Sequence, residues 1–141
     1  MTRINRSALE TPGGFASREV ARFLWQMDDH RRLVIEQTGG LTVEELGWQP
    51  SPGMNTIGML LAHLAVAETN LIQVGVRTEA AGHTRDVIGI GEDDDGLPLP
   101  ADGAPPAVLA GRPLEFFDDL LARARAHTRA TLIALPEGDL E

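Results

Sequence analysis

Two ionisable residues, His63 and Glu68, interrupt an otherwise apolar stretch that reads NTIGMLLAHLAVAETNLI over residues 55–72. On a helix His63 falls between Leu60 and Leu64, so we expect its ring to face packed side chains rather than bulk water. A buried imidazole needs its nitrogens satisfied, either by a hydrogen bond to a carbonyl or carboxylate or by a metal ion. The residues alone leave both interpretations of His63 open.

Glu68 lies about 140° around the same helix from His63, so the two side chains are not expected to bind one ion. A carboxylate on an apolar face is costly unless it is paired. We favour a salt bridge with an arginine of another helix, for instance Arg31 or Arg125. The alternative is a catalytic role, either in acid–base chemistry or as a carboxylate behind a metal ligand.

Two further histidines, His30 and His127, lie at the edges of apolar faces on other predicted helices. They are weaker candidates for a metal site shared with His63, and we expect both to be partly exposed. A site made of all three histidines requires the third long helix to run antiparallel to the second. If these helices run the same way, His127 lies nearer the opposite end from His63.

Three long helices are predicted to carry these residues, because apolar positions recur in each with a 3.6-residue period. They begin after Ser17, after Asn55 or Thr56, and at Pro113, and they end near Gly39, Arg77 and Leu135. A capping-box pattern at residues 42–45 predicts one additional helical turn. The second long helix is apolar around most of its circumference, which indicates a bundle of at least four helices. The fourth helix is expected from a further C-terminal segment or from another subunit.

The rest of the chain is predicted to be loop within a single domain of 141 residues. Residues 1–16 form a polar arm, and residues 78–112 form a long connection rich in glycine, proline and acid. Its acidic run GEDDDG, residues 91–96, lacks the alternating spacing and distal glutamate of an EF-hand loop. We therefore interpret this run as a solvated acidic turn.

Composition narrows the classes of function. A formal net charge of -9 argues against binding to nucleic acid or to an anionic membrane surface. The absence of cysteine excludes disulfides and fits the cytoplasm. The polar start is not a signal peptide, and the apolar run at residues 57–67 is too short to span a bilayer. We expect a cytoplasmic protein that binds neither nucleic acid nor membrane.

Residues 41–69, LTVEELGWQPSPGMNTIGMLLAHLAVAET, resemble the opening half of proteins in the DinB-like superfamily. The shared pattern is a short L-T-V-E-E-L turn, a proline–glycine link and a helix reading N-T-I-G-x-L-x-x-H-L-x-x-x-E. The glycine- and acid-rich connection and the segment LEFFDDLLARARAHTRATLIAL also fit this family. The resemblance extends from about Ser17 to Glu141.

This resemblance implies an all-α four-helix bundle, often dimeric, whose second and third long helices run in the same direction. Such proteins bind a divalent metal, typically zinc or nickel, through three side chains, and the first ligand matches His63. The other two belong to an H-x-x-x-H-like pair on the fourth helix. This sequence holds no such pair, so these ligands are expected beyond Glu141. Some relatives are S-transferases that use a small-molecule thiol, or isomerases.

Together these observations predict a DinB-like metal-dependent enzyme of transferase or hydrolase type, acting as a homodimer on an unidentified small substrate. The metal would act as a Lewis acid that lowers the pKa of a bound thiol or water. The alternative is a non-catalytic helical bundle that serves dimerisation or ligand binding, with His63 in a structural role.

Overall fold

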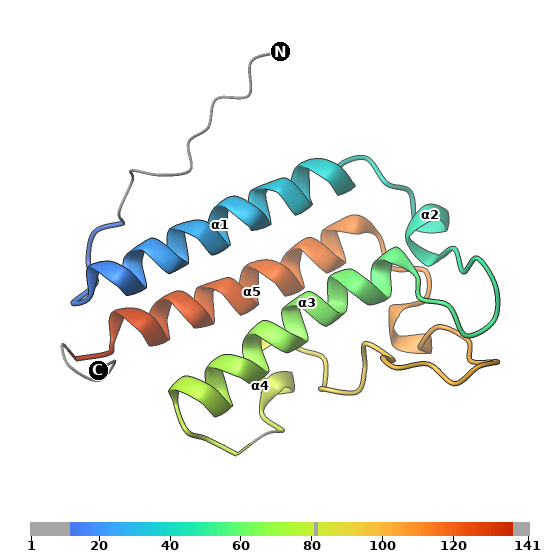
Figure 1. Ribbon diagram of the computed structural model, residues 1–141. Helices are drawn as coiled ribbons and strands as arrows, with labels where there is room; N and C mark the ends of the chain where they lie inside the picture. The colour runs from blue at the N-terminus through green and yellow to red at the C-terminus, as the bar shows by residue number, and fades with distance from the viewer. Residues whose placement is uncertain (1–11, 81, 137–141) are drawn as a thin grey trace, which may run out of the picture. The chain divides into compact units, whose positions relative to one another are not determined.

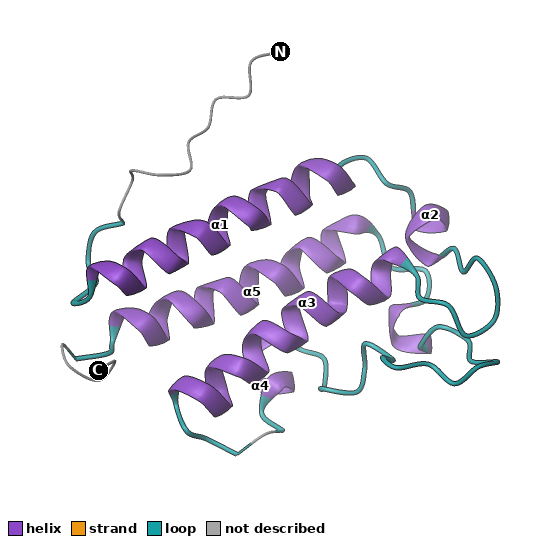
Figure 2. Ribbon diagram, in the orientation of Figure 1, coloured by secondary structure: helices purple, strands orange, loops and turns teal. Residues whose placement is uncertain are grey.

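The computed structural model describes residues 12–80 and 82–136, and within these ranges the chain forms helices and loops without strands (Figures 1 and 2). In chain order the elements are α1 (Arg18–Thr38), α2 (Val43–Gly47), α3 (Ile57–Leu71), the π-helix η1 (Ile72–Val76), α4 (Thr84–Ile88), the 3-10 helix η2 (Ala107–Leu109) and α5 (Leu114–Ile133). The all-α prediction is confirmed. The three long predicted helices correspond to α1, to α3 continued by η1, and to α5.

Side-chain caps fix where three of these helices begin. The Ser17 hydroxyl accepts a hydrogen bond from the first turn of α1, and Thr56 does the same for α3. Thr42 and Glu45 form both halves of the predicted capping box at α2. Each cap satisfies backbone N–H groups that have no partner inside the helix. The caps leave Thr56, rather than Asn55, as the residue that starts α3.

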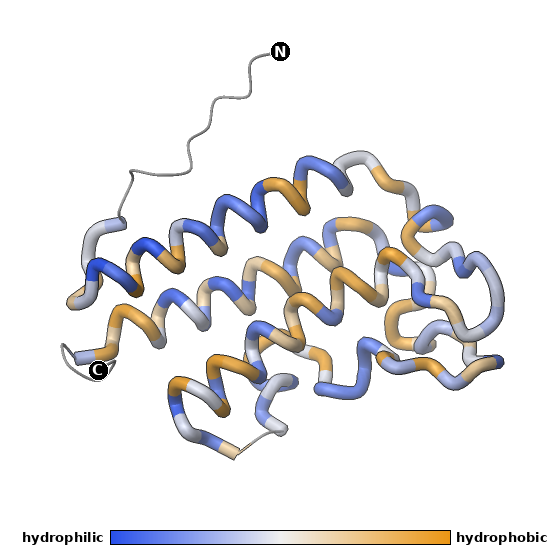
Figure 3. Tube along the Cα trace, in the orientation of Figure 1, coloured by the Kyte–Doolittle hydropathy of each residue, from blue (hydrophilic) through white to orange (hydrophobic). Residues whose placement is uncertain are grey.

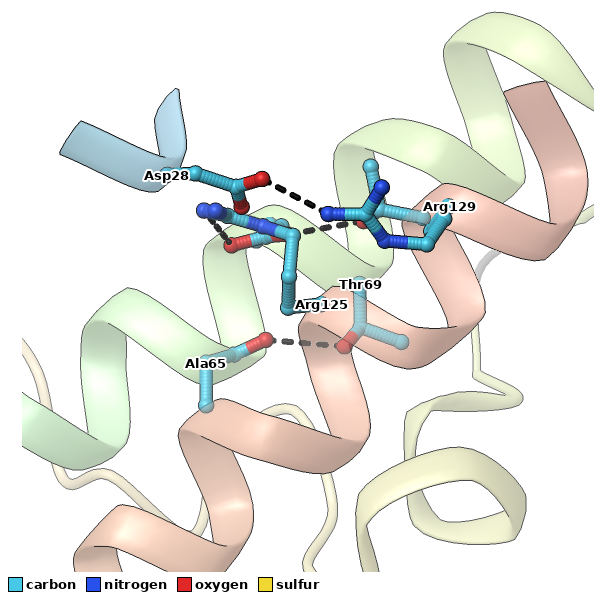
Figure 4. Close-up of polar contacts among 7 residues, drawn as sticks. Asp28, Ala65, Thr69, Arg125 and Arg129 are labelled. Atoms are coloured by element: carbon cyan, nitrogen blue, oxygen red, sulfur yellow. Dashed lines mark hydrogen bonds and ion pairs between the residues drawn. The ribbon is translucent and has the colours of Figure 1, made fainter. Parts of the chain in front are cut away.

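The chain divides into two compact units, the first made of residues 1–39 and 129–141. Residues 1–11 and 137–141 lie outside the described residues, and most of the predicted polar arm falls among them. Within this unit Arg129 donates to Asp28 over 2.6 Å, an ion pair drawn in Figure 4. In α1 the buried residues are Ala21 and Leu24, whereas Phe23 is 66% exposed. The buried face of α1 is therefore narrower than its apolar pattern.

The second unit, residues 40–128, is built on the packing of α3 against α5. A Cβ added at Gly58 would come within 2.8 Å of the Phe117 ring, and Arg125 bonds Glu68 further along both helices. Since these contacts follow the same order along both elements, α3 and α5 run parallel. Figure 3 shows α3 as apolar over most of its length. The core of this unit includes Leu46, Met59, Leu61, Ala62, Ala65, Ile88, Phe117, Leu121 and Ala124.

The predicted loop at residues 78–112 contains two short helices, α4 and η2, so its description as unbroken loop was wrong. α4 packs against α3, and Ile88, Ile90 and Leu109 are buried. Gly89 ends α4 with a φ of 88°, a left-handed conformation that glycine adopts without steric cost. These short apolar runs show no helical period in the sequence because tertiary burial, rather than amphipathic length, stabilises them.

α3 and η1 form one continuous helical segment, Ile57–Val76, which passes Glu68 and is longer than the apolar run read from the sequence. By length and composition it could cross a membrane, and it is the single such segment among the described residues. A core helix passes the same test, and 44% of the most apolar window of this one is buried against the chain itself. Its last turn is widened, since the Arg77 amide donates to the Ile72 carbonyl in an i to i+5 hydrogen bond of 3.0 Å.

The contact of Gly58 with Phe117 predicts that Gly58→Ala destabilises the protein. Phe117 is fully buried, so its ring cannot move aside freely, and overpacking of this kind costs about 1–3 kcal/mol. The free energy of unfolding in urea measures the effect. Gly75→Ala is the matched control, because an added Cβ there meets no atom within 4 Å. Equal stability of the two variants would contradict the close packing of α3 on α5.

Candidate functional site

The most distinctive polar contact of the second unit joins His63, on α3, to Asp95, in the connection between α4 and η2. His63 Nδ1 lies 2.8 Å from Asp95 Oδ2. The Asp95 side chain is only 4% exposed, whereas that of His63 is 47% exposed. The expectation that His63 faces packed side chains was therefore wrong, because its ring lies at the surface with a buried carboxylate behind it.

This geometry determines which nitrogen of the neutral ring carries the proton. An ionised carboxylate only accepts hydrogen bonds, so Nδ1 must donate to Asp95. In the neutral ring Nε2 then keeps its lone pair. His63 can thus present a basic nitrogen to a metal ion or to a proton donor, and Asp95 sets the direction in which it points.

The acidic run that carries Asp95 forms a turn, as the sequence predicted, but the turn is not solvated throughout, because Asp95 is buried. Asp94 Oδ2 accepts hydrogen bonds from the Gly91 amide at 2.6 Å and from Arg85 at 2.8 Å. Glu92 accepts from the amide of Gly82. Within residues 91–96 the carboxylates of Glu92, Asp94 and Asp95 accept hydrogen bonds from the protein, and the side chain of Asp93 is exposed.

An exposed apolar face runs along the same helix beside His63. It consists of Ile57, Leu60, Leu64, Leu71 and Val74, and we call it the apolar stripe. With the half-buried Ala67, its positions on α3 are separated alternately by three and four residues, the spacing of a helix–helix seam, whereas Val74 lies on η1. The apolar stripe itself carries no charge, and His63 lies at its edge.

Glu68 is fully engaged in a buried cluster with α5, in which its side chain is 8% exposed. Its Oε1 accepts from Arg125 and Thr128, each at 2.8 Å, and its Oε2 accepts from Arg125 at 3.1 Å. Figure 4 shows Arg125 reaching toward α3, where Thr69 bonds the carbonyl of Ala65. The sequence favoured a salt bridge with an arginine of another helix, and Arg125, one of the two examples it offered, forms such a bridge. Both carboxylate oxygens are occupied, which disfavours a role for Glu68 in proton transfer.

The structure does not join His127 to His63. Since α3 and α5 run parallel, His127 lies about six residues beyond the level of His63, on the order of 9 Å of helix rise. His127 Nδ1 is buried without a hydrogen-bond partner, and His30 is exposed on α1. Within residues 12–80 and 82–136 no three His, Asp or Glu side chains gather to hold a metal. Of the three histidines considered, His63 alone has a carboxylate behind its ring at hydrogen-bond distance.

Burial lowers the pKa of His127, chiefly because the charged ring would lose its hydration. The nearby Arg77 lowers this pKa further, while Glu79 and Glu68 raise it by smaller amounts. These surroundings therefore favour the neutral form of His127.

The sequence matches the family model of the DinB superfamily over residues 26–141, which is most of the chain. The protein therefore belongs to the DinB superfamily. No curated protein and no solved structure matches it. The helical fold described above is consistent with this membership.

Asp95 is the residue that the sequence did not identify as part of the site. It lies 32 positions from His63, in a segment without helical or strand period, and only the return of the chain along α3 brings the two together. The sequence did predict a turn at this acidic run, since Asp and Gly favour turns, but it gave no signal that Asp95 is buried.

Replacing the arginine of the buried cluster tests its structural role. Arg125→Ala removes the guanidinium that bonds both carboxylate oxygens of the buried Glu68, a change that costs about 3–5 kcal/mol. Chemical denaturation of the purified variant measures this loss. The control is Arg123→Ala, which removes an exposed pair with Asp119 on the same helix and should change stability by less than about 1 kcal/mol. Similar losses in the two variants would show that the Glu68 cluster does not hold α3 to α5.

Proposed function

We propose that the protein is a metal-dependent enzyme of the DinB superfamily, of transferase or hydrolase type, and that His63 Nε2 is one of its metal ligands. The observation that carries the proposal is the contact of His63 Nδ1 with the buried Asp95 carboxylate. Histidines that bind metals commonly donate their other ring N–H to a carboxylate, which fixes the ring and raises its basicity.

The surroundings of His63 support the same role. The ring is half exposed, so a ligand can approach Nε2 from outside this unit. The neighbouring apolar stripe, once covered, would exclude water and lower the local dielectric, which strengthens electrostatic contacts at a metal. The described residues offer a divalent metal the His63 Nε2 donor, and they contain no group of three His, Asp or Glu that could hold the ion alone. The proposal therefore requires further ligands from outside the described residues, from the same polypeptide or from a second copy.

Zinc and nickel suit this site, because neutral imidazole is a favoured ligand of both. When bound, such an ion supplies Lewis acidity that lowers the pKa of a coordinated thiol or water. The protein would contribute His63 to hold the ion, Asp95 to orient His63, and an apolar surface to shield the substrate. A small-molecule thiol is the substrate class that fits this chemistry, and the cytoplasm is the compartment in which such thiols are abundant.

Elemental analysis of the full chain after incubation with zinc or nickel tests the metal site. We expect His63→Ala to retain less than about a tenth of the bound metal, since loss of one ligand of three removes most of the affinity. His30→Ala, an exposed histidine on α1, serves as the control and should bind as the wild type does. Metal content that is equal in wild type and His63→Ala, or absent from the wild type, would contradict the proposal.

The apolar stripe favours a second candidate function, a helical module that forms a homodimer without catalysing a reaction. Two copies of α3 can meet along this surface without bringing like charges together, because its five large side chains are aliphatic. The alternating spacing of three and four residues is that of helices packed by knobs into holes. In this case His63 and Asp95 form a polar rim that fixes the register of the two copies.

Light scattering coupled to size exclusion measures the association directly. For the double variant Leu64→Gln and Leu71→Gln we expect a dimer dissociation constant raised by at least about 10-fold, because buried aliphatic contacts at the centre of the seam are lost. Ile35→Gln, an exposed aliphatic residue on α1, is the control and leaves association unchanged. A monomeric wild type at high concentration, or a double variant that dimerises equally well, would exclude the apolar stripe as the interface.

A further inference from the structure

The acidic loop at residues 91–97 is placed to do more than connect α4 to η2. We infer that Asp95 is a positioning residue, which holds His63 in the Nδ1–H tautomer so that Nε2 is the nitrogen offered to a ligand. The part of this inference that concerns metal affinity rests on the proposed function. The part that concerns the tautomer stands on the hydrogen bond alone.

The two oxygens of Asp95 have separate partners, which gives the carboxylate one orientation. Oδ1 accepts from the Leu97 amide at 3.1 Å, and Oδ2 lies 2.8 Å from His63 Nδ1. Because the side chain is almost completely buried, water does not compete for these bonds. A carboxylate held in this way directs the plane of the imidazole as well as its proton.

The loop around Asp95 is anchored independently of His63. Arg85 of α4 bonds Asp94, and the Gly91 amide bonds the same carboxylate oxygen. Gly96 has a φ of 75°, and a Cβ added there would come within 2.4 Å of the Pro106 ring. The backbone on both sides of Asp95 is thus fixed by its own contacts, so the carboxylate position does not depend on the histidine.

This arrangement predicts what happens when the carboxylate is removed. A neutral imidazole without a fixed partner samples both tautomers and rotates about χ2. A metal at Nε2 would then bind only the fraction of rings with the correct tautomer and direction. Loss of a hydrogen-bond partner behind a metal-binding histidine lowers metal affinity by about 10- to 100-fold. Removal of an exposed acid of the same loop should not do so.

The test compares Asp95→Ala with Asp93→Ala, which removes an exposed carboxylate two residues away. Long-range ¹H–¹⁵N correlation spectra of the full chain, at a pH above the usual histidine pKa of about 6.5, report the tautomer of His63. We expect Nδ1–H in wild type and Asp93→Ala, and a mixture in Asp95→Ala. Titration with zinc against a chromophoric chelator should show affinity about 10- to 100-fold lower in Asp95→Ala alone. Asp95→Leu, which is similar in size and has no hydrogen-bonding group, replaces the alanine variant if the latter does not fold.

Three outcomes would overturn the inference. These are a mixed or Nε2–H tautomer in the wild type, an unchanged tautomer in the Asp95 variant, and equal zinc affinity in the Asp95 and Asp93 variants when His63→Ala abolishes binding. If His63→Ala binds zinc as tightly as the wild type, the proposed metal site fails instead. The tautomer spectra, which need no metal, would still decide whether Asp95 positions the ring.

Discussion

The parallel packing of α3 on α5 is the constraint on which the rest of residues 40–128 depends. Parallel helices cannot be joined by a short turn, because the chain must return over the length of the first helix before it begins the second. The segment Ile57–Val76 has 20 residues and spans roughly 30 Å. The long connection after it is this return path, and it brings Asp95 back to the level of His63. The site therefore depends on the topology, since His63 lies on α3 and Asp95 lies on the connection that returns along α3.

Two carboxylates near α3 show how the surroundings of an acid decide its role. Both carboxylate oxygens of Glu68 accept hydrogen bonds from α5, so this side chain links α3 to α5. Asp95 uses one oxygen to brace its own loop and turns the other toward a ring that remains half exposed. A buried carboxylate whose oxygens are both bonded to neighbouring helices stabilises the fold. A carboxylate that accepts a hydrogen bond from an exposed imidazole changes what the imidazole can bind.

The sequence predicted the elements with strong local signals and missed those that depend on tertiary contacts. The three long helices, the Thr42 capping box and the pairing of Glu68 with an arginine of another helix follow from periodicity, capping chemistry and the cost of a lone buried charge. α4 and the burial of Asp95 were missed because residues 84–97 are stabilised by packing against α3 and by hydrogen bonds to their own carboxylates. The exposure of His63 was missed for a related reason. The sequence of a helix that is apolar around most of its circumference does not reveal which part of its surface the rest of the chain covers.

The widened turn of η1 limits how far a straight helix could lie along α3. In a π-helix each residue turns through a smaller angle about the helix axis than in an α-helix. The side chains after Leu71 are therefore displaced around the axis from the row of exposed side chains on α3. A second α-helix could therefore keep a regular packing register with this segment only over α3 itself, which is roughly 20 Å long. A straight α-helix packed along α3 would therefore lose its register with the segment at Ile72, where the π-helix begins.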